Sequence, residues 1–514
     1  MRGSSRLIVG VTGLAVLVLG ASGSAAQQTP VPATPASPTA PAPGSPAPGA
    51  APGGVGTAPG TTSTRVLGLD EAVQLAVRQN PTLEEATAAI RRAEAVVAEV
   101  RSFQLPRFDG NASLTVQGPI PVFTLTTPAT TPGGVARTET IPFGKTFTRN
   151  FSITGSYNPD PFGRIGSQRE VARRQVNVAR GGYFTAQNEL VYAVQNVYLA
   201  TLRAQELVRV QQEALAAAQE QLRVADAQFR AGTAPEFDVL RARVQVENTR
   251  QNLVTASANV RRTTSSLGRL LSIEPTTAVE LTPISLPAGA EGVAASTARA
   301  ILAPQGVPGA NEPLPDTLET TLTQAFNQRP EVYRAEWARR VAQAQVNYER
   351  KGMLPTVSLT AGGFYNPDVT GFAAVDKSWS VIANVAIPIW DAGLTRARTR
   401  EARADVQAAA ARLRGERDQI AEEVKTALVD VEESAERRRT AVANVEQARE
   451  AFRIAQVRYT AGLAPNVEVT DAQAALTQAR ANQVNADYDY IAALAALNRS
   501  LGVYAGTALA ELRQ

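Results

Sequence analysis

Acid–base and ligand chemistry in this chain can come only from carboxylates, hydroxyls and basic side chains, because its 514 residues include no histidine and no cysteine. The most common general base and metal ligand, the thiol nucleophile and the disulfide are therefore all missing. No nucleophile stands at a suitable spacing from a base. We therefore expect no enzyme, no cofactor and no metal site.

Among the carboxylates that lie three residues apart, one pair falls near the start of a predicted helix. Glu468 and Asp471 lie three residues apart, shortly after Pro465. In a helix, this spacing places both side chains on one face. Acidic residues near the start of a helix also interact favourably with the helix dipole, which is a purely structural reason for their presence. What else the pair does depends on the elements that position it.

The N-terminus has the layout of a secretory signal peptide at residues 1–26. Arg2 and Arg6 precede a short apolar run, and the segment ends in Ser-Ala-Ala. The run is too short to span a bilayer, and a retained membrane anchor is the alternative. Residues 27–64, rich in Pro, Ala and Gly, are expected to form a disordered leader. Without the two arginines the net charge falls from +4 to +2 (49 basic minus 47 acidic residues), which gives little support to nucleic-acid binding.

Two blocks of sequence occur twice. Residues 69–106 resemble 318–355 at a shift of 249 (318 minus 69), and residues 229–250 resemble 459–480 at a shift of 230 (459 minus 229). Internal repeats of this kind indicate a repeated structural unit. We therefore predict a first repeat, a Pro/Gly/Ala-rich linker, a second repeat and a short tail, at residues 65–274, 275–315, 316–505 and 506–514.

Each repeat contains a long helix with a seven-residue pattern. Steps of four and three residues from Leu190 to Phe229 meet apolar residues at ten of twelve positions, and so do the same steps 230 residues later. A sustained 3.5-residue period predicts helices that supercoil around their neighbours. We expect helices at about 165–231 and 394–461, each on the order of 100 Å long. Glycine and then proline follow each one, which predicts a tight turn into a returning helix.

Between the helices the period changes from 3.5 to 2. Apolar and polar residues alternate along four segments, which predicts strands with one apolar and one polar face at 107–117, 146–157, 356–365 and 377–387. Strands of about 9 to 11 residues suit a transmembrane β-barrel, whereas an antiparallel sheet on a soluble core shows the same alternation. Arg149 falls on the apolar face and is the main misfit.

Four strands cannot close a barrel, and unpaired strand edges are not tolerated in lipid. Several chains must therefore contribute strands, and threefold symmetry would give twelve (three chains with four strands each). The first hairpin is longer than the second because of residues 118–144, which are rich in Pro and Thr. We expect that stretch to be an outward-facing loop.

These features together resemble the TolC family of outer-membrane efflux proteins over about residues 67–504. The matching segments are LGLDEAVQLAVRQNP, LETTLTQAFNQRPEV, IPIWDAGLTRAR, FRAGTAPEFDV and YTAGLAPNVEVTDA. The resemblance implies a mainly α protein with a membrane β part, in which long coiled-coil-like helices form an α-barrel and four strands per chain contribute to a trimeric 12-stranded β-barrel. It also implies two internal structural repeats.

The implied function is a passive exit duct in the bacterial outer membrane, with its helical tunnel projecting into the periplasm. Such a homotrimer would serve efflux or type I secretion together with an inner-membrane pump and a periplasmic adaptor, and would contact outer-membrane lipid but no nucleic acid. A periplasmic coiled-coil adaptor or scaffold without its own pore is the alternative, although no lipoyl-like domain is visible. A carboxylate-dependent surface hydrolase is a further alternative.

The resemblance also assigns candidate site residues. Glu468 and Asp471 match the acidic positions of the family's tunnel constriction, where three chains would offer six carboxylates and attract cations. Tyr459 and Asp238 match positions in its gate-holding bonds, although Ala464 stands where some members have the gate arginine. The candidate adaptor-docking positions lie at the two helical turns, and Thr233 departs there from the family's Gly-Leu pattern; they are Gly232, Thr233, Gly462 and Leu463.

Overall fold

The computed structural model describes residues 65–127, 134–142, 145–274, 279–284, 317–369 and 375–505. The predicted signal peptide, the leader as far as residue 64 and the C-terminal tail lie outside these residues, as does most of the predicted linker.

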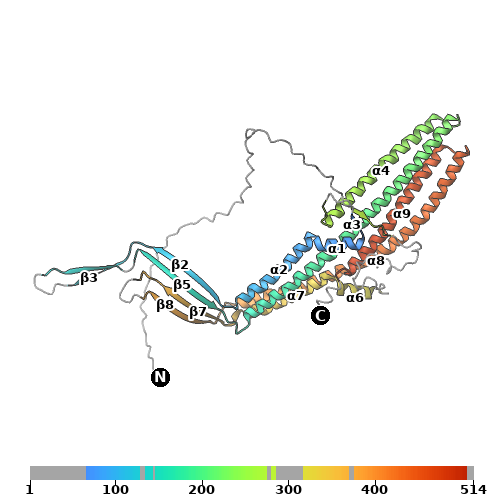
Figure 1. Ribbon diagram of the computed structural model, residues 1–514. Helices are drawn as coiled ribbons and strands as arrows, with labels where there is room; N and C mark the ends of the chain where they lie inside the picture. Colours follow the sequence, from blue (N-terminus) through green and yellow to red (C-terminus); the bar gives the residue numbers. More distant parts are fainter. Residues whose placement is uncertain are drawn as a thin grey trace, which may run out of the picture. The chain divides into compact units, whose positions relative to one another are not determined.

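The two repeats have the same succession of helices (Figure 1). Each begins with a short and a middle-length helix, crosses into strands, and continues with a helix of 67 residues and a returning helix. The predicted long helices are confirmed to within one residue at each end. The first repeat contains α1 Leu69–Gln79, α2 Pro81–Ser102, α3 Arg164–Arg230 and α4 Glu236–Leu270, and the second contains α6 Leu318–Gln328, α7 Pro330–Arg350, α8 Leu394–Thr460 and α9 Asn466–Leu501.

A proline separates the first two helices of each repeat. The residues before Pro81 and Pro330 are Asn80 and Arg329, and both have extended backbones, with ψ of 127° and 125°. Extended geometry is what proline imposes on the residue before it. The repeated block therefore contains two helices with a bend between them, and the two residues at the bends face the ends of α4 and α9.

The four predicted strands form one antiparallel sheet in the order β2-β5-β7-β8. Its register pairs Ala112 with Phe151 and Phe151 with Tyr365, so the apolar sides of all four strands lie on the same face. Most of the large apolar side chains on this face are exposed. The strands are β2 Arg107–Val116, β5 Phe147–Tyr157, β7 Thr356–Tyr365 and β8 Lys377–Ala386, as the two-residue period predicts.

Arg149 lies on the apolar face, opposite Leu114, so the predicted register is correct. Its guanidinium reaches past the end of β7 to Asp368, which is only 7% exposed, with Nε–Oδ2 and Nη2–Oδ1 distances of 2.9 and 3.1 Å. The Arg149 amide and Lys145 also donate to this carboxylate. These hydrogen bonds, led by the one from the Arg149 side chain, hold the pKa of Asp368 well below its usual range. Arg149, the polar residue on the apolar face, therefore joins the start of β5 to the segment that follows β7.

The sequence led us to expect a loop at residues 118–144, and the structure corrects this prediction. They contain β3 Val122–Thr127 and β4 Arg137–Pro142, which pair antiparallel in a separate two-stranded sheet. Alternating Thr with Val, Leu, Phe and Ile favours strands even where no core is available. The first repeat therefore carries an additional β-hairpin.

The predicted linker also needs a correction, because part of it belongs to the packed body. Residues Val279–Leu281 form β6, which pairs in parallel with β1 Arg65–Leu67. The fully buried Tyr198 of α3 donates its hydroxyl to the carbonyls of Leu67 and Thr282, at 3.1 and 2.8 Å. The strands are three residues long and pair across more than 200 residues of sequence, so local patterns do not reveal them.

Helix α3 is the centre of the helical packing. It contacts α2 and α7 in its first part and α4 and α9 in its second, as Figure 1 shows. After Val210 the predicted seam is followed only in part, because Ala218 and Ala225 are buried as predicted but Ala214 and Gln221 are buried in place of Leu215 and Leu222. The buried side turns where α4 and α9 replace α2 and α7 as neighbours of α3. The largest core cluster includes Leu67, Val194, Tyr198, Leu199, Leu202, Leu267, Leu271, Ile491 and Leu494.

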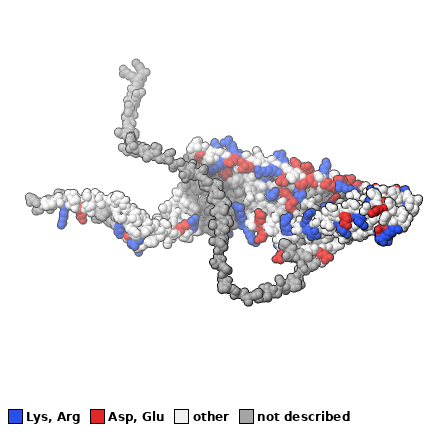
Figure 2. Space-filling model, turned by 90° about the horizontal axis from the view of Figure 1, so that it is seen from above, with Lys and Arg blue, Asp and Glu red and all other residues white. Residues whose placement is uncertain are grey.

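Charged side chains are distributed unevenly. On the face shown in Figure 2, Lys and Arg are interspersed with Asp and Glu over the helices, and the strand-containing part is mostly uncharged.

Within the described ranges, every helix is too short or too polar to cross a membrane.

Candidate functional site at the hairpin tips

Two helical hairpins end in turns of the same geometry. The first hairpin is α3–α4 and the second is α8–α9, and Gly232 and Gly462 in their turns have φ of +74° and +73°. The next residue in each turn, Thr233 or Leu463, donates its backbone N–H to the carbonyl five residues earlier, at 2.9 and 2.8 Å. The left-handed glycine and this bond end a helix in the manner that the sequence predicts.

The two tips differ in the side chain that follows the glycine. The Thr233 hydroxyl donates back to the Gln228 carbonyl at 3.0 Å and so is satisfied within its own helix. Leu463 is 73% exposed. Of the four candidate docking positions, only Leu463 therefore presents a large apolar group at its tip.

The acidic pair lies at the start of α9, on the second hairpin. The Glu468 carboxylate is 3.0 Å from Arg458 Nη1 of α8, and both side chains are about half exposed. Asp471 is exposed, and in the part of the chain that the structure describes no basic side chain lies within ion-pair distance of it. Nor do the described residues include three Asp or Glu side chains grouped closely enough to hold a metal ion. Within one chain, the charge of Glu468 is thus balanced by Arg458, and the charge of Asp471 is not balanced by an ion pair among the described residues.

Tyr459 and Asp238 are neighbours without a hydrogen bond between them. Tyr459 is 5% exposed and packs with Ala455, Val469 and, across to the first hairpin, Val224. Its hydroxyl has no hydrogen-bond partner among the described residues. Burial raises the pKa of Tyr459, and the nearby negative charge of Asp238 raises it further. Within the described residues, Tyr459 and Asp238 therefore interact only through the charge of Asp238.

Buried amides join the two hairpins close to these residues. The side chain of Gln221 in α3 donates to that of Asn466 in α9 at 2.7 Å, and Gln473 in α9 donates to the Ala214 carbonyl at 3.2 Å. Sequence reasoning missed all three amides. The sequence signal that could have found them is an uncharged polar residue at a helix position that packing buries.

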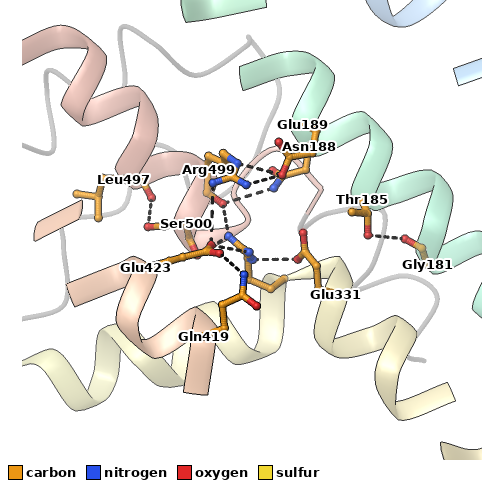
Figure 3. A network of polar contacts seen from close by, with 11 residues as sticks. Gly181, Thr185, Asn188, Glu189, Glu331, Gln419, Glu423, Leu497, Arg499 and Ser500 are labelled. Atoms are coloured by element: carbon orange, nitrogen blue, oxygen red, sulfur yellow. Dashed lines mark hydrogen bonds and ion pairs between the residues drawn. The ribbon is translucent and has the colours of Figure 1, made fainter. Parts of the chain in front are cut away.

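A second polar cluster lies where the bend of the second repeat meets the end of α9 (Figure 3). Arg329, only 3% exposed, donates to Glu331 at 2.9 Å and to Glu423 at 2.8 Å, and its guanidinium also contacts the carbonyls of Arg499 and Ser500. Arg499 pairs with Glu189 of α3. This cluster fixes one end of the second hairpin.

The first repeat has a simpler contact at the equivalent place. Asn80, which corresponds to Arg329 (80 plus 249), donates its side-chain amide to the Leu270 carbonyl at 2.9 Å. Leu270 corresponds to Ser500 (270 plus 230), whose carbonyl Arg329 contacts. The Asn80 amide thus contacts the C-terminal end of α4, and the buried Arg329 contacts the C-terminal end of α9 at the equivalent place.

The chain thus combines an exposed apolar sheet with long helical hairpins in two repeats. Residues 72–272 and 321–503 match the outer membrane efflux protein family. The chain belongs to that family.

Individual relatives agree with this assignment. Protein CyaE of Bordetella pertussis is 25% identical over 345 residues, which are 66% of this chain and 64% of that protein. The pyoverdine export outer membrane protein OpmQ of Pseudomonas putida is 24% identical over 68% of this chain and 70% of that protein. The Campylobacter jejuni CmeC outer membrane channel has the same fold, with a TM-score of 0.64 at 19% identity over 87% of this chain and 88% of that chain.

Proposed function

We propose that three copies of this chain form a passive exit duct through the outer membrane. The observation that carries the proposal is the sheet. Its apolar face is exposed, and among the described residues its outer strands, β2 and β8, each have one unpaired edge. Lipid tolerates no free strand edge, so the edges must pair with other copies. The antiparallel order continues correctly from β8 to β2 of a next copy, and three copies give the twelve strands of a closed barrel (three times four).

The helical hairpins support the same assembly. On α4, the side opposite α3 exposes Phe237, Leu240 and Val244 near the tip. On α8, the side opposite α9 exposes Ile454 and Val457 near its own tip. Within the described residues neither surface is covered, and α4 and α8 of adjacent copies would meet as antiparallel neighbours. Apolar burial of this kind drives association between subunits.

The duct performs no chemistry in this proposal, so the energy for transport comes from an inner-membrane pump through a periplasmic adaptor. The names of the relatives include pyoverdine export, and we infer an export or secretion role of the same kind here. Leu463 offers an apolar contact for the adaptor at the second tip. The rival proposal of an adaptor or scaffold without a pore leaves the exposed apolar sheet without a function.

Oligomeric state and conductance test the duct. We expect the mature chain in detergent to have the mass of a trimer and to form channels in planar bilayers. Leu240→Glu on the exposed side of α4 should yield monomers, and Asn248→Asp, on the same side but outside the apolar group, should stay trimeric. A wild-type protein that is monomeric and never conducts would eliminate the proposal.

We propose further that Glu468 and Asp471 from three chains line the narrow inner end of the duct. Six carboxylates around one axis would attract divalent cations and slow the current. Replacing both residues by Ala should weaken block by divalent cations, whereas Glu432→Ala, an exposed acid far along α8, should not. Unchanged block in the double variant would remove the acidic pair from the constriction.

A further inference from the structure

The apolar face of the four-stranded sheet carries charge at one end only. Along the described strands of this face the charged residues are Arg149 of β5 and Lys377 of β8, and both are cations. Both stand near the strand ends that lie away from the helices (Figure 1). We call this the outer end of the sheet, since it faces outward in the proposed duct. Two strand spacings, about 10 Å across the sheet, separate the two residues.

The cations at the outer end exceed the carboxylates there. Asp368 accepts from both Arg149 and Lys145, so two cations share one carboxylate. The bonds to Asp368 use Nε and Nη2 of Arg149, and the Arg149 side chain is still 49% exposed. Asp376, next to Lys377, is the second carboxylate. Three cations thus stand against two carboxylates, and the excess favours an anion.

Lys377 is the cation whose place the fold itself does not explain. Arg149 joins two segments of the chain through Asp368. Among the described residues, by contrast, no carboxylate lies within ion-pair distance of Lys377, whose ammonium lies 5.8 Å from the centre of the Tyr365 ring. A charged group on a face that is otherwise apolar is costly unless it meets an opposite charge. Lys377 is therefore available to a group from outside the chain.

Inward from these cations, a missing side chain leaves a groove in the apolar face. Gly363 of β7 lies between Ile153 of β5 and Trp379 of β8 in one row of paired residues. A Cβ atom on Gly363 would meet no other atom within 4 Å. In the next row outward, the rings of Phe151 and Tyr365 stack with their centres 6.2 Å apart. Gly363, Ile153, Phe151 and Tyr365 all line a cavity of about 560 Å³.

The groove has the shape of a site for one hydrocarbon chain. It runs along β7 over two small residues, Gly363 and Ala361. Ile153 on one side, and Trp379 and Val381 on the other, are largely exposed and form its walls. Every acyl chain of a bilayer meets apolar surface, so the walls give the groove its shape while the cations at its outer end select the headgroup.

We propose that this surface binds one anionic, phosphate-bearing lipid per chain. The phosphate lies between Arg149 and Lys377, and one acyl chain fills the groove over Gly363. Arginine N–H groups and a lysine ammonium are both strong partners of phosphate oxygens. Aromatic rings such as that of Tyr365 favour the boundary between headgroups and hydrocarbon, which is where this arrangement places them. The inference rests on the proposed duct, which sets the outer end of the sheet at the membrane surface.

Lipid retention by the full mature protein tests the charge selection. The trimer would be purified in detergent and incubated with phosphatidylglycerol or with phosphatidylcholine, and native mass spectrometry would count the bound lipids. We expect one phosphatidylglycerol per chain and weaker retention of the zwitterionic lipid. Lys377→Gln should weaken phosphatidylglycerol binding by about fivefold, as expected for one basic side chain at an anionic lipid. Lys425→Gln, at an exposed position of α8, is the matched control and should bind as the wild type does.

A second variant tests the groove without changing any charge. Gly363→Leu fills the groove, and the open space there accepts the side chain. It should lower phosphatidylglycerol retention while the trimer mass and the conductance stay unchanged. Val385→Leu, near the inner end of β8 on the same face, is its control and should retain the lipid.

The outcomes separate the lipid site from the duct. Equal retention of the two lipids by the wild type would mean non-specific lipid only. That result, or equal phosphatidylglycerol retention in the wild type, Lys377→Gln and Gly363→Leu, would overturn the site and leave a conducting trimer intact. A wild-type protein that is monomeric and forms no channels would refute the duct and the lipid site with it.

Discussion

Replacing Tyr459 by phenylalanine should tighten the inner end of the duct rather than open it. The Tyr459 hydroxyl is buried between the hairpins and has no hydrogen-bond partner among the described residues. An unpaired buried hydroxyl costs about 1 to 3 kcal/mol. If opening exposes the side of the ring that packs on Val224, the lower limit of this range corresponds to an open fraction reduced by about fivefold.

The same residue should make the channel respond to alkaline pH. Burial, with the charge of Asp238, raises the pKa of Tyr459 in the packed tip, whereas a tyrosine exposed by opening titrates near 10. The packed tip is therefore fully favoured below about pH 10 and loses stability as the pH rises above that value. Conductance measured from about pH 8 to about pH 11 should rise in the wild type and stay flat in Tyr459→Phe. An open fraction that increases in Tyr459→Phe at neutral pH would show that the hydroxyl makes a holding bond after all, and would refute the reasoning.

Three further predictions concern other parts of the fold. Arg329→Ala should lower the free energy of unfolding by about 3 to 5 kcal/mol, because Glu331 and Glu423 lose their buried partner. Asn80→Ala in the first repeat should lower it by only about 1 kcal/mol. Denaturant titration measures both losses, and equal losses would contradict the difference between the repeats. Gly502→Ala should also destabilise the end of α9, since φ is +75° there and a Cβ atom would lie 2.8 Å from the Gln328 backbone, and a variant with unchanged melting temperature would argue against that contact. Asp368 has a lowered pKa, so its bonds to Arg149 and Lys145 should stabilise the hairpin ends fully above about pH 4, and this stabilisation should decline as the pH falls below that value toward the lowered pKa; protease cleavage near residue 368 should increase on acidification in the wild type and change less with pH in Asp368→Asn.

The sequence was sufficient for the elements that local periodicity defines. The ends of α3 and α8 follow from glycine and proline at fixed positions, and the four sheet strands follow from a period of two. The pairing of β1 with β6 could not be predicted, because three-residue strands more than 200 residues apart carry no local signal.

The candidate site was predicted only in part. The positions of Glu468, Asp471, Asp238 and Tyr459 near the tips agree with the helix pattern, but their partners do not follow from it. Gln221 and Asn466 are 245 residues apart and meet only because α3 packs on α9. Which amide faces which helix is decided by that packing, which is not visible in a single sequence.

The correspondence between the two repeats extends to the strands and to the symmetry of the proposed ring. Strand β2 becomes β7 on adding 249 (107 plus 249 is 356), and β5 becomes β8 on adding 230 (147 plus 230 is 377). The pairing of β5 with β7 inside the chain is thus the counterpart of the proposed pairing of β8 with β2 between chains. In that proposed pairing, Phe151 opposite Tyr365 corresponds to Val381 opposite Val116 of the next copy (151 plus 230, and 365 minus 249), and both valines lie on the apolar face. In the proposed ring of three chains, each half of a chain would therefore supply an equivalent pair of strands, and the ring would consist of six such pairs.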